Sequence, residues 1–138
     1  MPLLIGTLFS NFQSCKKIID ETYYIDYVFT NLTDSEIKIT AIIFDEENES
    51  NRFFVIKEDS VLMQQCEMNF GDCSEQIFFS DSVVIIFRDT LRACYSRDIN
   101  SQYNILLGSN FIKEHISENH DVYSYEFTQE DVSHANTY

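Results

Sequence analysis

Tryptophan, glycine, proline and basic residues are all scarce in this sequence of 138 residues. It has 0 Trp, 3 Gly, 1 Pro, and 9 Lys plus Arg against 23 Asp plus Glu. So few glycines and prolines argue against a low-complexity or disordered chain. The isolated Gly6, Gly71 and Gly108 offer no glycine-rich phosphate loop. The formal net charge of −14 repels phosphate backbones and anionic lipid surfaces, which argues against a nucleic-acid-binding protein.

A substantial hydrophobic core is available despite the missing tryptophan. Hydrophobic residues make up 44% of the chain, with 12 Phe and 8 Tyr. A chain of this length suits one domain. We therefore expect a single globular domain that does not depend on disulfides for its stability.

The N-terminal segment before Cys15 has two of the three parts of a secretory signal. The run from Pro2 to Phe9 is the apolar stretch, and Ser14 is the small residue before a cut at Cys15. The basic start is missing, because no Lys or Arg precedes Lys16. A start codon assigned too far downstream would explain the missing basic start. The run is far shorter than the about 20 apolar residues that cross a bilayer. The alternative is an N-terminal strand or helix buried in the core, with Cys15 an ordinary thiol.

Three segments carry a resemblance to a known group of proteins. They are Ser14–Lys17, Tyr23–Asn31 and Asp81–Thr90. The chain resembles small uncharacterised lipoproteins of Bacteroidetes over most of residues 15 to 131. The resemblance implies a signal cut just before Cys15, acyl chains on that cysteine as a membrane anchor, and a place in the cell envelope, on the periplasmic or surface face of the outer membrane.

This interpretation divides the chain into four parts. They are a signal segment with a truncated start (1–14), a short tether (15–21), a β-sandwich domain (22–132) and a C-terminal tail (133–138). The usual lipoprotein box has Leu three residues before the cysteine and a small residue two before it, whereas Phe12 and Gln13 stand here.

The four cysteines are Cys15, Cys66, Cys73 and Cys94. If Cys15 is acylated, three remain. Cys66 and Cys73 flank the turn signal Gly71-Asp72, so a hairpin could bring them into bonding distance and leave Cys94 unpaired. The alternative is three reduced, partly buried thiols that act as small hydrophobic side chains.

Alternation of apolar and polar residues with a period of two dominates the chain, which indicates half-buried strands. Residues 23–30 and 37–44 alternate clearly, and the turn chemistry between them predicts a hairpin. Shorter strands are expected at 52–56 and 61–68, after a polar loop at 45–51.

The second half of the chain predicts further strands. The apolar run Val83–Phe87 indicates a central strand covered on both faces, forming a hairpin with Ala93–Tyr95. Residues 104–115 fit either a loop or a short helix capped by Ser109. Tyr123–Phe127 alternates as a final strand, and Thr128–Val132 predicts one capped turn.

Short strands separated by turn signals, without a sustained helical period, predict an antiparallel β-sandwich. We expect an immunoglobulin-like arrangement of about seven strands, although 0 Trp removes the usual pairing of core cysteines around a tryptophan. A partly open barrel is the alternative.

No pattern of residues predicts catalysis, a cofactor or a metal site. The acidic residues concentrate at 45–49 and 126–131, where we expect them to be solvated rather than paired in a cleft. His115, His120 and His134 form no short-spaced pair with the cysteines, as a zinc site requires. The acidic loop 45–49 lacks the alternating ligands and mid-loop glycine of a calcium loop.

Three triplets resemble the Asp-Ser/Thr-apolar pattern that Bacteroidetes use for O-linked glycans on exported proteins. Their hydroxyls belong to Ser60, Ser82 and Thr90. The same triplets also arise at the starts of strands, so the pattern has a purely structural alternative.

Two functional classes are compatible with these observations. The first is a membrane-anchored, non-catalytic β-sandwich that binds a protein or glycan at the cell envelope. The second is an accessory or structural subunit of a surface assembly. An untethered intracellular acidic β-domain is a third, weaker alternative, because the basic start is missing.

Overall fold

The chain is mostly β-structure in a computed structural model, which describes residues 22–45, 47–69 and 71–137. In these residues eight strands have six or more residues, and a ninth has two. The elements are β1 (Tyr24–Asn31), β2 (Ile37–Phe44), β3 (Glu49–Ile56), β4 (Val61–Glu67), the 3₁₀ turn η1 (Ile77–Phe79), β5 (Ser82–Phe87), β6 (Leu91–Ser96), the 3₁₀ turn η2 (Gly108–Asn110), β7 (Ile112–Ser117), β8 (His120–Phe127), α2 (Gln129–Ser133) and β9 (Asn136–Thr137).

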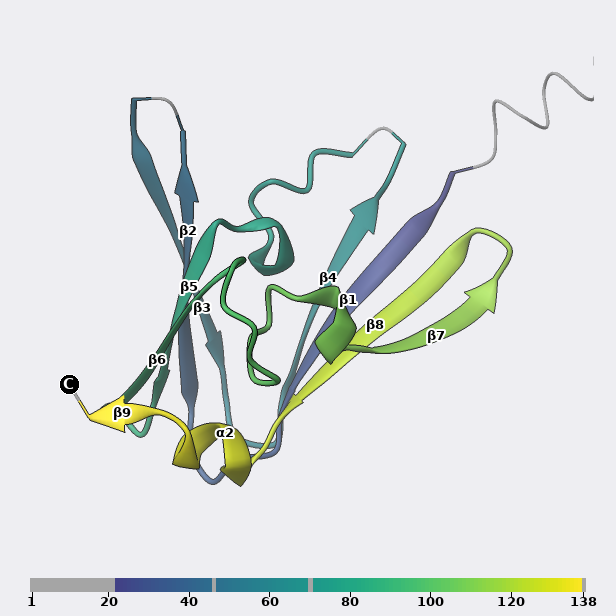
Figure 1. Cartoon of the computed structure of the whole chain (residues 1–138). Helices are drawn as coiled ribbons and strands as arrows, with labels where there is room; N and C mark the ends of the chain where they lie inside the picture. Colours follow the sequence, from purple (N-terminus) through teal and green to yellow (C-terminus); the bar gives the residue numbers. More distant parts are fainter. Residues whose placement is uncertain (1–21, 46, 70, 138) are drawn as a thin grey trace, which may run out of the picture.

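The strands form two sheets. Sheet A has the order β4-β1-β8-β7, and sheet B the order β3-β2-β5-β6-β9. All neighbours are antiparallel except β1 and β8, which run parallel. The sheets approach each other at the end where α2 lies and diverge toward the other end (Figure 1).

Side chains that alternate along the strands build the core between the sheets. Sheet A contributes Tyr27, Phe29 and Phe127, and sheet B contributes Ile37, Ile39 and Ile85; all six are at most 2% exposed. Burying one face of each sheet in this way is the main stabilising contribution in a fold of this kind.

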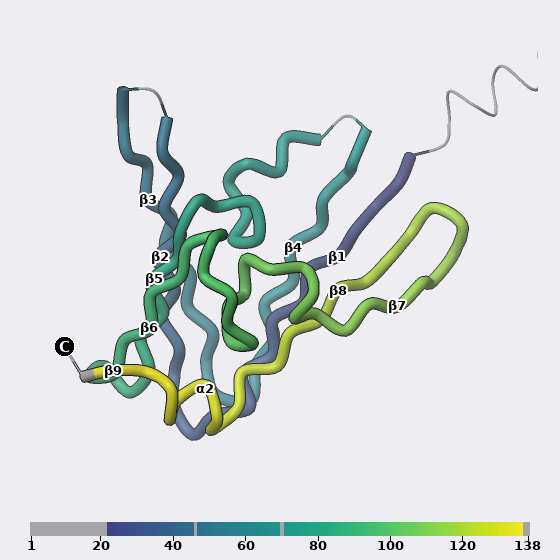
Figure 2. Tube along the Cα trace, in the orientation of Figure 1, coloured from purple at the N-terminus to yellow at the C-terminus, as the bar shows by residue number. Residues whose placement is uncertain are grey.

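Two irregular segments fill the space between the diverging sheets (Figure 2). The segment that carries η1 buries Ile77, and the segment between β6 and β7 buries Ile105 and Leu106. The ring of Phe78 stacks on Tyr27 of β1 at a centroid distance of 4.5 Å. These segments therefore belong to the core, although they contain no strand.

The predicted all-β, sandwich-like architecture is confirmed. The strands expected around residues 23–30, 37–44 and 123–127 correspond to β1, β2 and β8. The predicted hairpin of Val83–Phe87 with Ala93–Tyr95 corresponds to β5 and β6, which pair antiparallel. The period of two predicts these strands correctly because each of them presents one face to the core.

The predicted hairpin of residues 23–30 with 37–44 is wrong. β1 belongs to sheet A and β2 to sheet B, so the turn between them crosses from one sheet to the other. Asn31, which is 0% exposed, holds this corner through a bond from its amide to the carbonyl of Ile56 (2.9 Å). Alternation specifies which face a strand buries, but it does not specify the strand's neighbour.

The segment 104–115 was expected to be a loop or a helix capped by Ser109. It contains only the short turn η2, in which no side chain caps the first turn, and residues 112–117 form strand β7. All six residues of β7 are exposed, so the strand shows no alternation of buried and exposed residues that a sequence pattern could reflect.

Two further boundaries and the burial of one strand differ from expectation. β3 begins at Glu49, inside the predicted polar loop, and the predicted C-terminal tail contributes β9, which pairs with β6. β5 is central, as predicted, but Val84 and Ile86 on its outward face are only half-buried. The strand is therefore fully covered on one face rather than on both.

Candidate functional site

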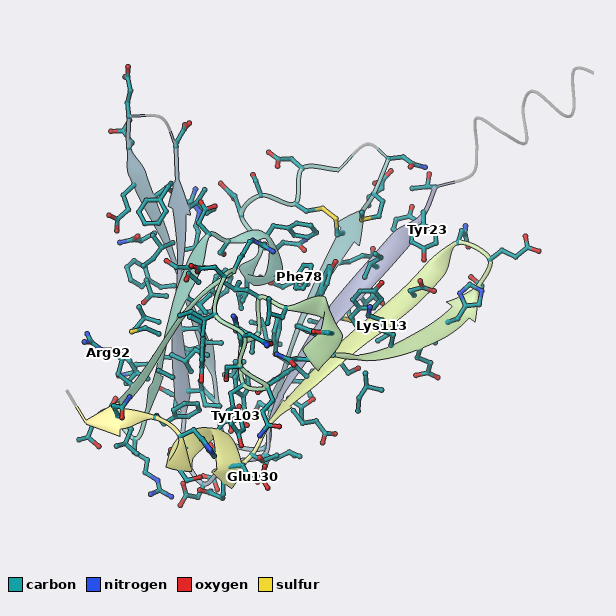
Figure 3. The ribbon with its side chains drawn as sticks, in the orientation of Figure 1. Tyr23, Phe78, Arg92, Tyr103, Lys113 and Glu130 are labelled. Carbon is teal, nitrogen blue, oxygen red and sulfur yellow. A yellow bond between two sulfur atoms is a disulfide. The ribbon has the colours of Figure 1, made fainter. Side chains whose placement is uncertain are left out.

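A polar hollow lies where sheet A meets α2. Its volume is about 280 Å³. It is lined by residues from the segment before β7, from β7 and β8, and from the turn into α2: Gln102, Tyr103, Asn110, Ile112, Ser124, Tyr125, Glu126, Thr128, Glu130 and Asp131. Tyr103 and Glu130 lie at this end of the molecule in Figure 3. Elements far apart in the sequence thus meet at one site.

The helix side of the hollow is shaped by a capping box. The Thr128 hydroxyl accepts a bond from the Glu130 backbone N–H (3.3 Å), and the Asp131 carboxylate accepts one from the Thr128 N–H (2.8 Å). This reciprocal pair fixes the start of α2. The sequence predicted this capped turn, and the structure confirms it.

Asp131 is a buried carboxylate, which corrects the expectation that the acids at 126–131 are all solvated. It is 5% exposed. Burial raises its pKa, although bonds from Thr128 and Tyr125 act in the opposite direction. The Tyr125 hydroxyl donates to Asp131, and burial together with that bond raises the pKa of Tyr125. Asp131 therefore stabilises the floor of the hollow through these hydrogen bonds.

The opposite wall is held by two asparagines, of which Asn104 is buried and Asn110 is half-buried. Asn104, which is fully buried, donates to the carbonyls of Ser96 (2.9 Å) and Ile99 (2.8 Å). Asn110 donates to the carbonyls of Ser101 (2.7 Å) and Asn104 (2.8 Å). These bonds link the turns of the irregular segment to one another and to the end of β6, which favours a single conformation of the segment.

Tyr103 is the aromatic group of the hollow. Its ring packs on His134 with centroids 4.2 Å apart, and its hydroxyl accepts a bond from Gln102 (2.7 Å). The exposed Glu126 and Glu130 add negative charge beside it. An aromatic ring with amides, hydroxyls and carboxylates suits an uncharged polyhydroxylated ligand or a cationic one, and it repels anions.

A second hollow, of about 370 Å³, lies near the start of β1. It is lined by Thr22, Tyr23, Asn69, Glu118 and Asn119. Residues 21 and 70, which adjoin this lining, lie outside the described part of the chain. The hollow beside α2 is the candidate site, because side chains from the segment before β7, from β7 and β8, and from the turn into α2 converge on it.

Sheet A also carries two imidazole–carboxylate pairs near the second hollow. His120 Nε2 lies 2.7 Å from Asp26 Oδ2 across the outward face. His115 Nδ1 lies 2.6 Å from Asp121, which also accepts a bond from the Tyr23 hydroxyl. The Tyr23 and His115 contacts lower the pKa of Asp121, and the bond to Asp121 raises the pKa of Tyr23 to about 12.

Both pairs link neighbouring strands of sheet A. A catalytic imidazole must activate a nearby hydroxyl or thiol. Within residues 22–45, 47–69 and 71–137, no serine, threonine or cysteine side chain bonds either ring. The same residues contain no group of three His, Cys, Asp or Glu side chains placed to hold a metal ion.

The structure brings only two of the predicted site residues together, Cys66 and Cys73, and Cys15 falls outside the described residues. Cys66 at the end of β4 and Cys73 form a disulfide with a Cα–Cα distance of 5.7 Å, while Cys94 is an exposed free thiol on β6. The pairing of Cys66 with Cys73 is the one that the intervening turn signal allowed.

The three candidate glycosylation residues differ in exposure. Thr90 is exposed in the tight β5–β6 turn, beside Arg88 and Asp89 with positive φ. Ser60 is half-buried in the β3–β4 turn, and Ser82 is half-buried at the start of β5 between two neighbouring strands. Of the three, Thr90 has the geometry most open to modification.

Sequence reasoning missed the hollow beside α2. Its capped turn was visible as a local motif, but its other wall comes from residues 102–110, where the sequence showed neither a helical nor a strand period. Only the tertiary structure brings the two together. One usable signal was the recurrence of asparagine at positions 104 and 110, since asparagine side chains commonly bond the backbone of irregular segments.

The fold and the site together define an all-β, sandwich-like domain with a polar, acid-lined hollow at one end. Comparison with protein-family models, with curated proteins and with solved structures gives no match to this chain. Among the described residues, no helix is both long enough and apolar enough to cross a membrane.

Proposed function

We propose that this protein is a non-catalytic binding module of the bacterial cell envelope, and that its ligand, part of a protein or glycan, occupies the hollow beside α2. The observation that carries the proposal is the hollow itself: its walls are fixed by side-chain hydrogen bonds of Asn104, Asn110 and Asp131. Preformed walls favour binding because little conformational entropy is lost when a ligand enters.

The membrane anchor is the second part of the proposal. Its support is the apolar run Pro2–Phe9 followed by Ser14-Cys15, and an acyl chain on Cys15 would tether the domain. The test is the intact mass of the protein made in its native host from its true start codon. A mass that begins at Cys15 and includes acyl chains supports the anchor, and an unprocessed chain from Met1 contradicts it.

An immunoglobulin-like class is the finer fold that we propose. Its support is the antiparallel pairing of β2 with β5, because the second and fifth strands are neighbours in immunoglobulin domains. The pairing of β1 with β4 and β8 differs from the constant-type order. An experimental structure that shows the same β2–β5 pairing but a barrel closure would place the domain in another class.

Ligand binding at the hollow can be tested by nuclear magnetic resonance on the full chain. The probes are a neutral oligosaccharide and an oligolysine peptide, which represent the two chemistries that the lining accepts. We expect one probe to shift the backbone amide signals of the hollow, and Tyr103→Ala to weaken that binding about tenfold or more, as loss of an aromatic anchor does.

The matched control is Tyr24→Ala, which removes a half-buried tyrosine from the outward face of β1. It should leave the affinity of the probe unchanged. If neither probe shifts the signals of the hollow, or if both variants weaken binding equally, the hollow is not the binding site.

A second candidate function is supported by a separate observation. Phe44, Phe53 and Val55 on the outward face of sheet B are 61%, 75% and 52% exposed. Exposed apolar groups of this kind commonly mark protein interfaces, which favours an accessory or structural subunit of a surface assembly. Co-purification from native membranes separates the two: an assembly subunit co-purifies with other proteins in stoichiometric amounts, and a binding module does not.

A further inference from the structure

Within the described residues, β3 is the long edge strand whose outer backbone no other segment covers. It pairs only with β2, at the end of sheet B. An unpaired edge exposes a row of backbone N–H and C=O groups that can accept another strand. β3 has eight residues, no proline and no recorded bulge.

The other edge strands are shorter, and each is partly covered or interrupted. β9 covers part of the outer side of β6. At β4, the Gln76 amide bonds the Gln65 carbonyl (2.6 Å), and the Cys66–Cys73 disulfide ties the following segment to the strand end. β7 is interrupted by a register shift between His115 and Ser117. Bulges and covering segments are the devices by which proteins prevent edge-to-edge pairing.

The outward row of β3 is apolar at its centre. Phe53 is 75% exposed and Val55 is 52% exposed, and both lie on the face of sheet B that points away from the core. Phe44 of β2 is 61% exposed near the free end of the same hairpin. Isolated exposed apolar residues are ordinary, but here they coincide with a free edge.

Symmetry restricts how two copies of β3 can pair. A two-fold axis perpendicular to the sheet keeps outward side chains on the outward face of both copies, so the axis must pass through a residue rather than between two residues. The two eight-residue strands overlap almost completely only if the axis lies near the middle of β3. The possible axes therefore pass through Arg52 or Phe53. An axis through Arg52 places two arginines opposite each other, which is unfavourable.

The axis through Phe53 gives complementary neighbours throughout. The two Phe53 rings face each other, Asn51 faces Val55 of the other copy, and Arg52 faces Phe54. At each end Glu49 faces Lys57, so the pairing gains two opposite-charge contacts. Glu49 and Lys57 are both exposed in the single chain.

We propose that β3 pairs antiparallel with β3 of a second copy of this chain, with Phe53 opposite Phe53, to form a two-fold dimer whose two B sheets are continuous. This inference does not depend on the hollow beside α2, which lies on sheet A. Loss of either proposal leaves the other unaffected.

The first test is sedimentation velocity of the full chain over a range of concentrations at physiological ionic strength. We expect a concentration-dependent dimer. Phe53→Lys, which places two cations on the axis, should raise the dissociation constant at least about tenfold. Val61→Lys is the control, because Val61 is a 58% exposed apolar residue on the edge strand β4 of the other sheet.

A monomer at every concentration overturns the proposal, and so does a dimer that both variants weaken equally. Circular dichroism distinguishes a loss of dimerisation from a loss of folding. Since Phe53 is mostly exposed, its replacement should leave the spectrum of the monomer unchanged.

The second test is a charge swap that reports the register. Glu49→Lys and Lys57→Glu should each raise the dissociation constant, by about threefold to tenfold, because each places like charges at both ends of the interface. The double variant should restore the affinity, since the opposite charges then face each other again. If the double variant weakens dimerisation by the combined effect of the two single variants, the register centred on Phe53 is contradicted.

The third test traps the dimer covalently. In a Cys15→Ser, Cys94→Ser background, Phe53→Cys places two thiols across the axis at a separation typical of directly opposed strand residues, about 4.5–5.5 Å between Cβ atoms. Mild oxidation should give a disulfide-linked dimer. Val61→Cys in the same background should not cross-link, and equal cross-linking of the two variants would count against β3 as the interface.

Discussion

Asn31 shows how one buried polar side chain can hold a corner between two sheets. It is 0% exposed and makes four side-chain bonds: it donates to the carbonyls of Ser35 (2.8 Å) and Ile56 (2.9 Å), and accepts from the N–H (2.9 Å) and hydroxyl (2.7 Å) of Thr33. All four of its bonding positions are used. The residue therefore ties the end of β1 to the end of β3 and sets the course of the chain into β2.

Tyr23 and Asp121 make a residue-scale prediction about acidity. The Tyr23 hydroxyl bond is the largest cause of the lowered pKa of Asp121. Tyr23→Phe should therefore raise the pKa of Asp121 toward its ordinary value of 3.8, measured by the carboxyl carbon shift in an acid titration. Tyr24→Phe is the control, because Tyr24 lies on the opposite face of β1.

The same shift has a consequence for stability with a definite sign. The folded pKa of Asp121 lies below the unfolded value, so its contribution is present above pH 3.8 and is lost as the pH falls through the folded pKa. Tyr23→Phe should reduce this acid-side loss of unfolding free energy. If the slope below pH 3.8 is the same in both proteins, the hydrogen bond does not control the titration.

At the scale of elements, the disulfide between Cys66 and Cys73 secures the connection from β4 to η1. Cys66 is 2% exposed and belongs to the core. Beside it, Gln64 Oε1 accepts a bond from the Ile77 N–H (3.0 Å) and Gln76 bonds the Gln65 carbonyl. The segment that carries η1, which lies between the diverging sheets, is thus attached to sheet A at several points within a few residues.

Removing this disulfide should destabilise the protein. For a closed loop of about eight residues, the chain-entropy relation gives about 2.5 kcal/mol. The double variant Cys66→Ala, Cys73→Ala should therefore lose about that much unfolding free energy in urea. Cys94→Ser, which changes an exposed free thiol, should lose almost none; equal losses in the two proteins would show that the disulfide contributes nothing specific.

At the scale of the whole molecule, the net charge of −14 is the dominant electrostatic property. In the described part of the chain, ion pairs of Lys and Arg include Lys38–Asp89, Arg52–Glu75 and Arg88–Asp34, and all have exposed partners. Exposed pairs contribute little to stability. Most of the 23 acidic residues therefore repel one another across the surface.

This repulsion predicts that salt stabilises the fold. Raising ionic strength from about 0.01 M to 0.15 M shortens the screening length from about 30 Å to about 8 Å. The unfolding free energy in urea should rise over this range, equally in NaCl and KCl, because screening does not depend on the identity of the ion. A decrease, or an effect of one salt only, would indicate that specific ion binding outweighs repulsion.

The sequence identified the strands that bury one face and not those that bury none. The sequence alternates in β1 and in residues 123–127 of β8, and both strands were expected; β7, exposed along its whole length, gave no pattern. The candidate site was only partly visible. The capped turn at Thr128 is a local motif, but Asn104 and Asn110 complete the site through contacts that no local pattern reports.

The sequence by itself determined the class of the fold, the faces of its main strands, the capped turn at α2 and the strongly acidic surface. Each of these follows from local propensity or from composition. Only the tertiary structure decided that β1 pairs with β8 rather than with β2, that Asp131 is buried, and that β3 is left as a free edge. Strand neighbours are chosen by packing over the whole core, and that choice has no local signature.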